Sequence, residues 1–266
     1  IRLRRSQPLH STGPQRWSIR IFMPKREIPF AGHPTVGTAL LIKALGWLDE
    51  EGDAASLVLD EVAGPVPVVF SKHSEGYVLA RFSAPLPPSV SESKLQLADV
   101  ATLLMLSPEQ VKSSPYIAGC GASFQFVELI DDYAVSQASA NLSLWPLLLG
   151  NDEVQDLCIY SFSENTADIR MRMFAPLAGI PEDPATGSAA AALAGGFAIQ
   201  NQLSANQGWM IEQGSEVGRP SVIGTYVRIN NTNANAVKMK HEETISVEVF
   251  GSAVLMSKGS FYLYDA

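Results

Sequence analysis

Apolar and polar residues along the chain follow two patterns, one typical of strands and one of buried helices. Residues 17–23 alternate and are rich in Ile, Phe and Trp, which predicts a strand that ends at Pro24. Residues 34–47 are apolar on nearly every side, and residues 184–199 are rich enough in Ala to pack closely against a sheet. Because a helix that is apolar all round is buried, we place one helix through the middle of each half of the chain.

Short β-rich runs surround these two helices. They cover 57–59, 66–70 and 77–82 in the first half and 124–130, 157–162, 170–174, 209–212, 222–229, 244–254 and 260–263 in the second. Residues 94–112 predict a further helix. Many short strands around one helix per half predict an α+β fold with two pseudo-symmetric domains, 1–112 and 113–266, each a curved, mostly antiparallel sheet wrapped around its helix. The last strand can return to the N-terminal domain.

One local pattern occurs twice. A polar residue followed by Pro-x-x-Gly-(Thr/Ser)-Ala occurs at residues 33–39 (HPTVGTA) and again, 150 positions later, at residues 183–189 (DPATGSA). Just upstream, residues 20–24 (RIFMP) match residues 172–176 (RMFAP). A strand, a Pro-ended loop, a turn and an apolar helix therefore appear in both halves, which predicts two similar domains that face each other across a cleft.

The two repeated turns carry the candidate chemistry. A helix N-terminus presents unpaired N–H groups and a partial positive charge, so two of them can hold a small anionic metabolite and stabilise an enolate. His33 and Asp183 would face each other in the cleft and are the candidate catalytic residues for proton transfer. The candidate substrate-binding residues lie beside them: Gly32, Glu182, Gly187 and Ser188.

Each of these residues also has a purely structural interpretation. An Asp before Pro is an ordinary helix cap, and a His next to Pro is an ordinary turn residue. The equivalence of His33 and Asp183 in a duplicated unit favours the functional interpretation. Arg219 is either a clamp for a substrate carboxylate or a brace for the hairpin in which it lies.

Composition narrows the class of protein. A formal charge of −8 argues against nucleic acid as a partner, and no apolar run approaches the length of a membrane span. Cys120 and Cys158 form no disulfide framework, which favours a cytoplasmic protein. The four histidines lie scattered without metal-ligand spacing, and no nucleotide-binding motif is present, so we expect neither a metal nor an organic cofactor.

Four segments, in this order, carry a resemblance to a known family. They are 19–24 (IRIFMP), 27–34 (EIPFAGHP), 182–189 (EDPATGSA) and 211–221 (IEQGSEVGRPS). They resemble the PhzF (phenazine biosynthesis) family of isomerases. The resemblance implies the diaminopimelate-epimerase-like fold, a homodimer, and cofactor-free acid–base isomerisation of a small carboxylate.

The resemblance is incomplete at the residue that matters most. It implies that His33, Asp183 and Ser188 match secondary site residues and that Gly32 matches a backbone contact. The family's proton carrier is a glutamate upstream of Gly-His-Pro, and its place would fall near residues 3–6, which contain no acid. The epimerase relatives have a cysteine at each helix start, and neither start has one here.

Three interpretations follow. In the first, the natural protein has an N-terminal strand and helix, absent from this sequence, that supply the glutamate. In the second, the chain is a catalytically impaired homologue that binds a small ligand or a partner. In the third, Asp183 or Glu182, with His33, transfers the proton on a different substrate. If nothing replaces the missing strand, the first sheet has an exposed edge and the N-terminal domain is the less stable half.

Overall fold

The computed structural model describes residues 2–5, 15–48, 55–163, 167–229 and 245–259. The elements of the first part are β1 (Arg2–Arg5), β2 (Gln15–Phe22), β3 (Glu27–Ile28), α1 (Gly32–Ala44), β4 (Ser56–Glu61), β5 (Gly64–Lys72), β6 (Val78–Ser83), β7 (Ser89–Glu92) and α2 (Leu97–Leu104). Those of the second part are β8 (Tyr116–Gly119), β9 (Ser123–Glu128), α3 (Asp132–Gln137), α4 (Trp145–Leu148), β10 (Leu157–Phe162), β11 (Ile169–Ala175), β12 (Ile180–Asp183), α5 (Gly187–Gln200), β13 (Gln207–Gln213), β14 (Ser221–Ile229) and β15 (Ile245–Gly251).

The strand order shows the duplication directly. In the first unit β2 pairs antiparallel with β1 and parallel with β4, and β5 and β6 follow antiparallel. In the second unit β11 pairs antiparallel with β10 and parallel with β13, and β14 and β15 follow antiparallel. The short strands β3 and β12 pair with β2 and β11 in the same way. The two units join edge to edge where β6 pairs with β15.

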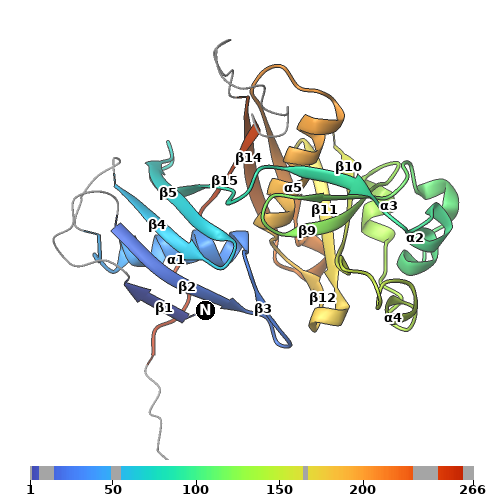
Figure 1. Ribbon diagram of the computed structural model, residues 1–266, viewed down its shortest axis with the longest axis horizontal. Helices are drawn as coiled ribbons and strands as arrows, with labels where there is room; N and C mark the ends of the chain where they lie inside the picture. Colours follow the sequence, from blue (N-terminus) through green and yellow to red (C-terminus); the bar gives the residue numbers. More distant parts are fainter. Residues whose placement is uncertain (1, 6–14, 49–54, 164–166, 230–244, 260–266) are drawn as a thin grey trace, which may run out of the picture.

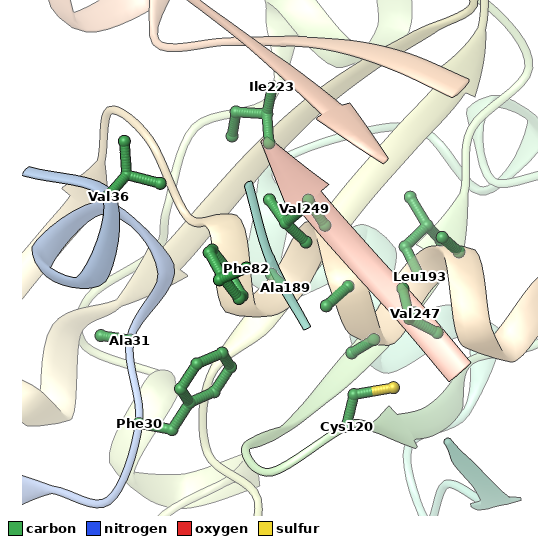
Figure 2. Close-up of a cluster of buried hydrophobic side chains, with 14 of the residues drawn as sticks. Phe30, Ala31, Val36, Phe82, Cys120, Ala189, Leu193, Ile223, Val247 and Val249 are labelled. Atoms are coloured by element: carbon green, nitrogen blue, oxygen red, sulfur yellow. The ribbon is translucent and has the colours of Figure 1, made fainter. Parts of the chain in front are cut away.

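Each unit is built around one helix, as the sequence pattern predicts. Figure 1 shows α1 beside the strands of the first unit and α5 among those of the second. All but the last two residues of α5 are buried, and its many Ala and Gly residues let β8, β14 and β15 approach closely. Figure 2 shows Val247 and Val249 of β15 beside Ala189 and Leu193 of α5. The predicted α+β class is therefore confirmed.

A second core extends the C-terminal part. β9, β8 and β7 continue the sheet beyond β10, and α2, α3 and α4 lie at the end remote from α1 (Figure 1). Trp145, Phe174 and Leu103 are fully or almost fully buried in this cluster. Although β7 and α2 precede residue 113, they pack with strands of the second half. The predicted division of domains at residues 112 and 113 stays a prediction.

Three local predictions differ from the structure. Residues 94–112 form α2 and a separate 3-10 turn, because Met105 adopts a left-handed conformation and Pro108 follows it. β1 in the basic leader was missed, and it covers the edge of β2 that was expected to be exposed if nothing filled it. α5 begins at Gly187 instead of 184, because a hydrogen bond from Thr186 to Asp183 holds the preceding residues in a turn. The predicted strand at 260–263 lies outside the described residues.

The two central helices meet at their N-termini through glycine. A Cβ atom added to Gly32 would lie 2.6 Å from the Gly187 carbonyl carbon and 2.7 Å from the Ser188 nitrogen. A Cβ atom added to Gly187 would lie 3.0 Å from the Gly32 Cα. No side chain fits between these backbones, so the starts of α1 and α5 are held in direct contact.

We expect Gly32→Ala to lower the free energy of unfolding by about 1–3 kcal/mol, because the added methyl group overlaps backbone that cannot rotate away. Gly37→Ala is the matched control in the same helix, since a Cβ atom there meets nothing within 4 Å. That variant should raise the free energy of unfolding by about 0.5–1 kcal/mol. Chemical denaturation measures both, and equal effects of the two substitutions would contradict the glycine contact.

Candidate active site

A cavity of about 420 Å³ opens where the two helices meet. Both units contribute to its wall, with Ala31 and His33 from the start of α1 and Thr186 and Ser188 from the start of α5. The apolar part of the wall includes Phe30, Phe124, Met23, Met173 and Ile180, and the ionisable part is Arg26, Glu27, His33, Glu153, Asp156 and Asp183. A volume of this size suits a small metabolite.

Asp183 lies in the wall at the end of β12, and a hydrogen-bonded turn fixes it there. The Thr186 hydroxyl donates to Asp183 Oδ2 at 2.6 Å. Gln213 Nε2 donates to the Asp183 carbonyl oxygen at 2.7 Å, and Gln213 Oε1 accepts from the Thr186 N–H at 2.9 Å. This turn delays the start of α5 to Gly187. Burial raises the pKa of Asp183 above its usual value, against the Thr186 hydrogen bond and the charge of His33.

His33 reaches the same cavity from the other unit. It is the second residue of α1, and its exposed side chain lines the cavity opposite the buried Asp183. The N-cap residues Ala31 and Thr186 make no side-chain hydrogen bond to the first turns of their helices. The first N–H groups of both helices therefore remain available near the cavity, where their partial positive charge favours an anion.

The other candidates from the sequence divide into two groups. Ser188 lines the cavity, while Gly32 and Gly187 form the helix contact that shapes its floor. Glu182 lies outside the cavity wall and forms a bidentate pair with Arg172 at 2.8 and 2.7 Å. Arg219 is exposed and does not belong to the cavity wall.

The Glu182–Arg172 pair has a complete set of partners. Arg172 Nη1 donates to the carbonyl oxygens of Val135 and Ala138 at the end of α3, at 2.9 and 2.7 Å. The side chains of Arg172 and Glu182 are nearly buried, and each of their nitrogen and oxygen atoms has a hydrogen-bond partner. The pair therefore fastens β11 and β12 to α3, which is a structural task.

Four ionisable residues of the wall were not candidates from the sequence, namely Arg26, Glu27, Glu153 and Asp156. Asp156 directly precedes β10, is only 8% exposed, and accepts a hydrogen bond from Arg26 Nη2 at 2.9 Å on Oδ2. Burial raises the pKa of Asp156, the nearby Asp183 carboxyl raises it further, and Arg26 lowers it. An acid immediately before a strongly apolar strand was the available signal in the sequence.

Glu61, at the end of β4, is a third buried acid, and it occupies the position of Gln213 in the other unit. Ser18 and Arg170 are equivalent, because each lies two positions before the matching residues Arg20 and Arg172. Ser18 pairs with Asp60 of β4, and Arg170 pairs with Glu212 of β13. The residues that follow, Glu61 and Gln213, therefore occupy equivalent positions. Glu61 Oε1 lies 2.5 Å from Thr35 Oγ1, which also lies 2.6 Å from the Ala31 carbonyl oxygen.

The Thr35 hydroxyl has one hydrogen and faces these two acceptors. The hydroxyl is the donor to both, so its single hydrogen is shared between the Ala31 carbonyl oxygen and Glu61 Oε1. Burial raises the pKa of Glu61 to about 7, against the hydrogen bonds from Thr35 and the Ala31 backbone. The Glu61 carboxyl thereby holds Thr35 in the first turn of α1 as Gln213 holds Thr186 at the start of α5.

Glu61→Gln should make the protein more stable at pH 8. The unfolded acid ionises at about pH 4.5 and the folded acid at about pH 7, so the stability that this group contributes is complete below pH 4.5 and is lost as the pH rises to 7. The loss is of the order of 3 kcal/mol. Denaturation between pH 4 and pH 8 should show a flatter stability profile for Glu61→Gln than for the wild type, and parallel profiles would contradict a protonated Glu61.

Neither cysteine takes part in the cavity wall. Cys120 and Cys158 are buried, and burial raises the pKa of Cys120 to about 12 and that of Cys158 well above its usual value. Both thiols therefore stay neutral and unreactive near neutral pH. Among the described residues there is no cluster of three His, Cys, Asp or Glu side chains able to hold a metal, and no helix long and apolar enough to cross a membrane.

Comparison with known proteins identifies the family. The model of the family described as "Phenazine biosynthesis-like protein" matches residues 8–259, and the chain belongs to this PhzF family. The trans-2,3-dihydro-3-hydroxyanthranilate isomerase of Pseudomonas aeruginosa is 31% identical over 245 residues, which cover 92% of this chain and 79% of that protein. An uncharacterized isomerase of Mesorhizobium japonicum is 31% identical over 262 residues, covering 92% and 80%.

Solved structures show the same fold. A PhzF-family protein of Bacillus anthracis superposes with a TM-score of 0.75 at 19% identity, covering 92% of this chain and 79% of that one. A hydroxyproline epimerase of Agrobacterium vitis superposes with a TM-score of 0.60 at 13% identity, covering 89% and 67%. The resemblance to the PhzF isomerases and the epimerase-like fold are thus confirmed.

Proposed function

We propose that the chain is a cofactor-independent isomerase that moves a proton on a small carboxylate held in the cavity between its two units. One observation carries this proposal above all others: His33 and Asp183, from opposite units, line one cavity beside two uncapped helix starts. The family supports the reaction class, since the relatives with 31% identity are named as isomerases.

The cavity has the parts that such a reaction needs. Removing a proton next to a carboxyl group creates an enolate, whose negative charge the helix N–H groups can stabilise. Asp183 is buried, and its raised pKa brings it nearer to neutral pH, where an acid–base group works best. His33 lies close enough for its charge to act on Asp183, and it can hold or return a proton.

The apolar wall favours a substrate with a flat hydrocarbon part. Phe30 and Phe124 stand in the wall with Ile180 and Met173, while the charged groups and helix starts supply the polar contacts. A ring that carries a carboxylate has both features. The substrate of the Pseudomonas aeruginosa relative, trans-2,3-dihydro-3-hydroxyanthranilate, is such a compound and is the first one to test.

Asp183→Asn should lower the turnover of this compound by about 10²- to 10⁴-fold, because the amide can neither accept nor release the proton. Proton NMR in deuterium oxide would follow both isomerisation and solvent deuterium at the substrate carbons. Asp99→Asn, at the exposed start of α2, is the control and should leave both rates unchanged. Unchanged turnover in Asp183→Asn would contradict this role, and binding of the compound without deuterium uptake would favour a ligand-binding homologue.

A further inference from the structure

Strand register places Asp156 on the same face of the sheet as Asp183. Cys158 of β10 is opposite Met173 of β11, and Met173 is opposite Asp183 of β12. Opposite residues on neighbouring strands point to one face, and residues two apart on a strand share that face. Asp156 lies two positions before Cys158, and its carbonyl oxygen accepts from the Gln125 N–H at 2.9 Å, which extends the pairing of β9 with β10. Both aspartates therefore point into the cavity, and both line it.

The two carboxylate oxygens of Asp156 differ in their hydrogen bonding. Oδ2 accepts the hydrogen bond from Arg26, which comes from the turn between β2 and β3 of the other unit. Oδ1 is buried and has no donor in the described part of the chain. A buried acceptor without a donor is costly and uncommon, and in an active-site cavity it is suited to receive a proton from a bound substrate.

Asp156 and Asp183 act on each other electrostatically. Each is buried, and the charge of Asp183 disfavours the ionised form of Asp156. Two such carboxyl groups in one cavity favour a state in which one is ionised and the other holds a proton. The charged groups that face them in the wall are Arg26, Glu27, His33 and Glu153.

We propose that Asp156 is a second catalytic residue of this site, which takes a proton from the substrate while Asp183 delivers one. Arg26 positions Asp156 and favours its ionised form. This inference rests on the proposed isomerase function.

The step balances without an external reagent. A C–H bond next to the substrate's carboxyl or carbonyl group breaks, an O–H bond forms on Asp156 Oδ1, and the electron pair moves into the conjugated system. The O–H bond of Asp183 breaks, and a new C–H bond forms at another carbon. The substrate loses one proton and gains one. After the product leaves, the proton on Asp156 returns to Asp183 through solvent.

A purely structural role for Asp156 makes different predictions. The Arg26–Asp156 pair joins the two units, so a structural pair would affect mainly the thermal stability and the KM when it is broken. A catalytic Asp156 affects kcat and the acidic limb of the pH–rate profile, since that limb reports the protonation of the base. Asp156→Glu retains a carboxylate and should restore part of kcat, which a structural role would not require.

Asp156→Asn should lower kcat for trans-2,3-dihydro-3-hydroxyanthranilate by about 100-fold or more, change KM by less than about threefold, and remove the acidic limb. Asp152→Asn is the matched control, because Asp152 lies in the same loop and is paired with Lys94 but is outside the cavity wall. It should leave kcat and the pH profile unchanged. A kcat within about threefold of the wild type in Asp156→Asn would overturn the inference, while loss of activity in Asp183→Asn would still support the proposed function.

Carbon-13 NMR titration of the aspartate carboxyl groups gives a test that does not need turnover. If Asp156 is the ionised member of the pair and Asp183 holds the proton, Asp156→Asn should lower the pKa of Asp183, because the neighbouring negative charge is gone. An Asp183 pKa that is the same in the wild type and in Asp156→Asn would overturn the shared proton. If the wild-type protein does not isomerise trans-2,3-dihydro-3-hydroxyanthranilate, the proposed function for that substrate is overturned. The catalytic role of Asp156 on that substrate is then overturned as well.

Discussion

The contact between Gly32 and Gly187 constrains everything else in the structure. It brings the N-termini of α1 and α5 together with no side chain between them. Because each helix runs through the middle of its own unit, that contact and the pairing of β6 with β15 fix the two units relative to each other. It also brings two sets of unpaired N–H groups to one place, which neither unit could supply alone. The cavity exists because the remaining first-turn side chains must lie around this contact.

The hydrogen bonds of the buried ionisable groups distinguish Arg172 and Glu182 from Asp156. Arg172 and Glu182 are nearly buried, yet their hydrogen bonds account for each other and for two backbone carbonyls, so they stabilise the fold. Asp156 is almost as buried, but one of its oxygens has no donor among the described residues. Glu61 Oε2 also has no donor among the described residues, but Glu61 does not line the cavity, whereas Asp156 does. The sequence motif draws attention to Glu182, while the hydrogen bonds draw attention to Asp156.

Local patterns in the sequence were sufficient for most of the fold. Apolar periodicity identified both central helices and the strands around them, because burial imposes it on each element separately. β1 was missed because backbone pairing with β2 does not require apolar alternation in an arginine-rich segment. The duplicated turns correctly brought His33 and Asp183 to one cavity. Arg26 and Asp156 could not be found in this way, since they are 130 positions apart and only tertiary packing joins them.

The duplication produces one asymmetric site because equivalent positions have diverged chemically. The last residue of β4 and the last residue of β13 each contact a threonine at a helix start. This residue is Glu61 in the first unit and Gln213 in the second. An amide is neutral at every pH, whereas burial raises the pKa of the Glu61 carboxyl to about 7. The charge beside Thr35 at the start of α1 therefore changes near neutral pH, while Gln213 beside Thr186 stays neutral. Gln213 therefore holds the turn that carries Asp183 without adding a charge next to it.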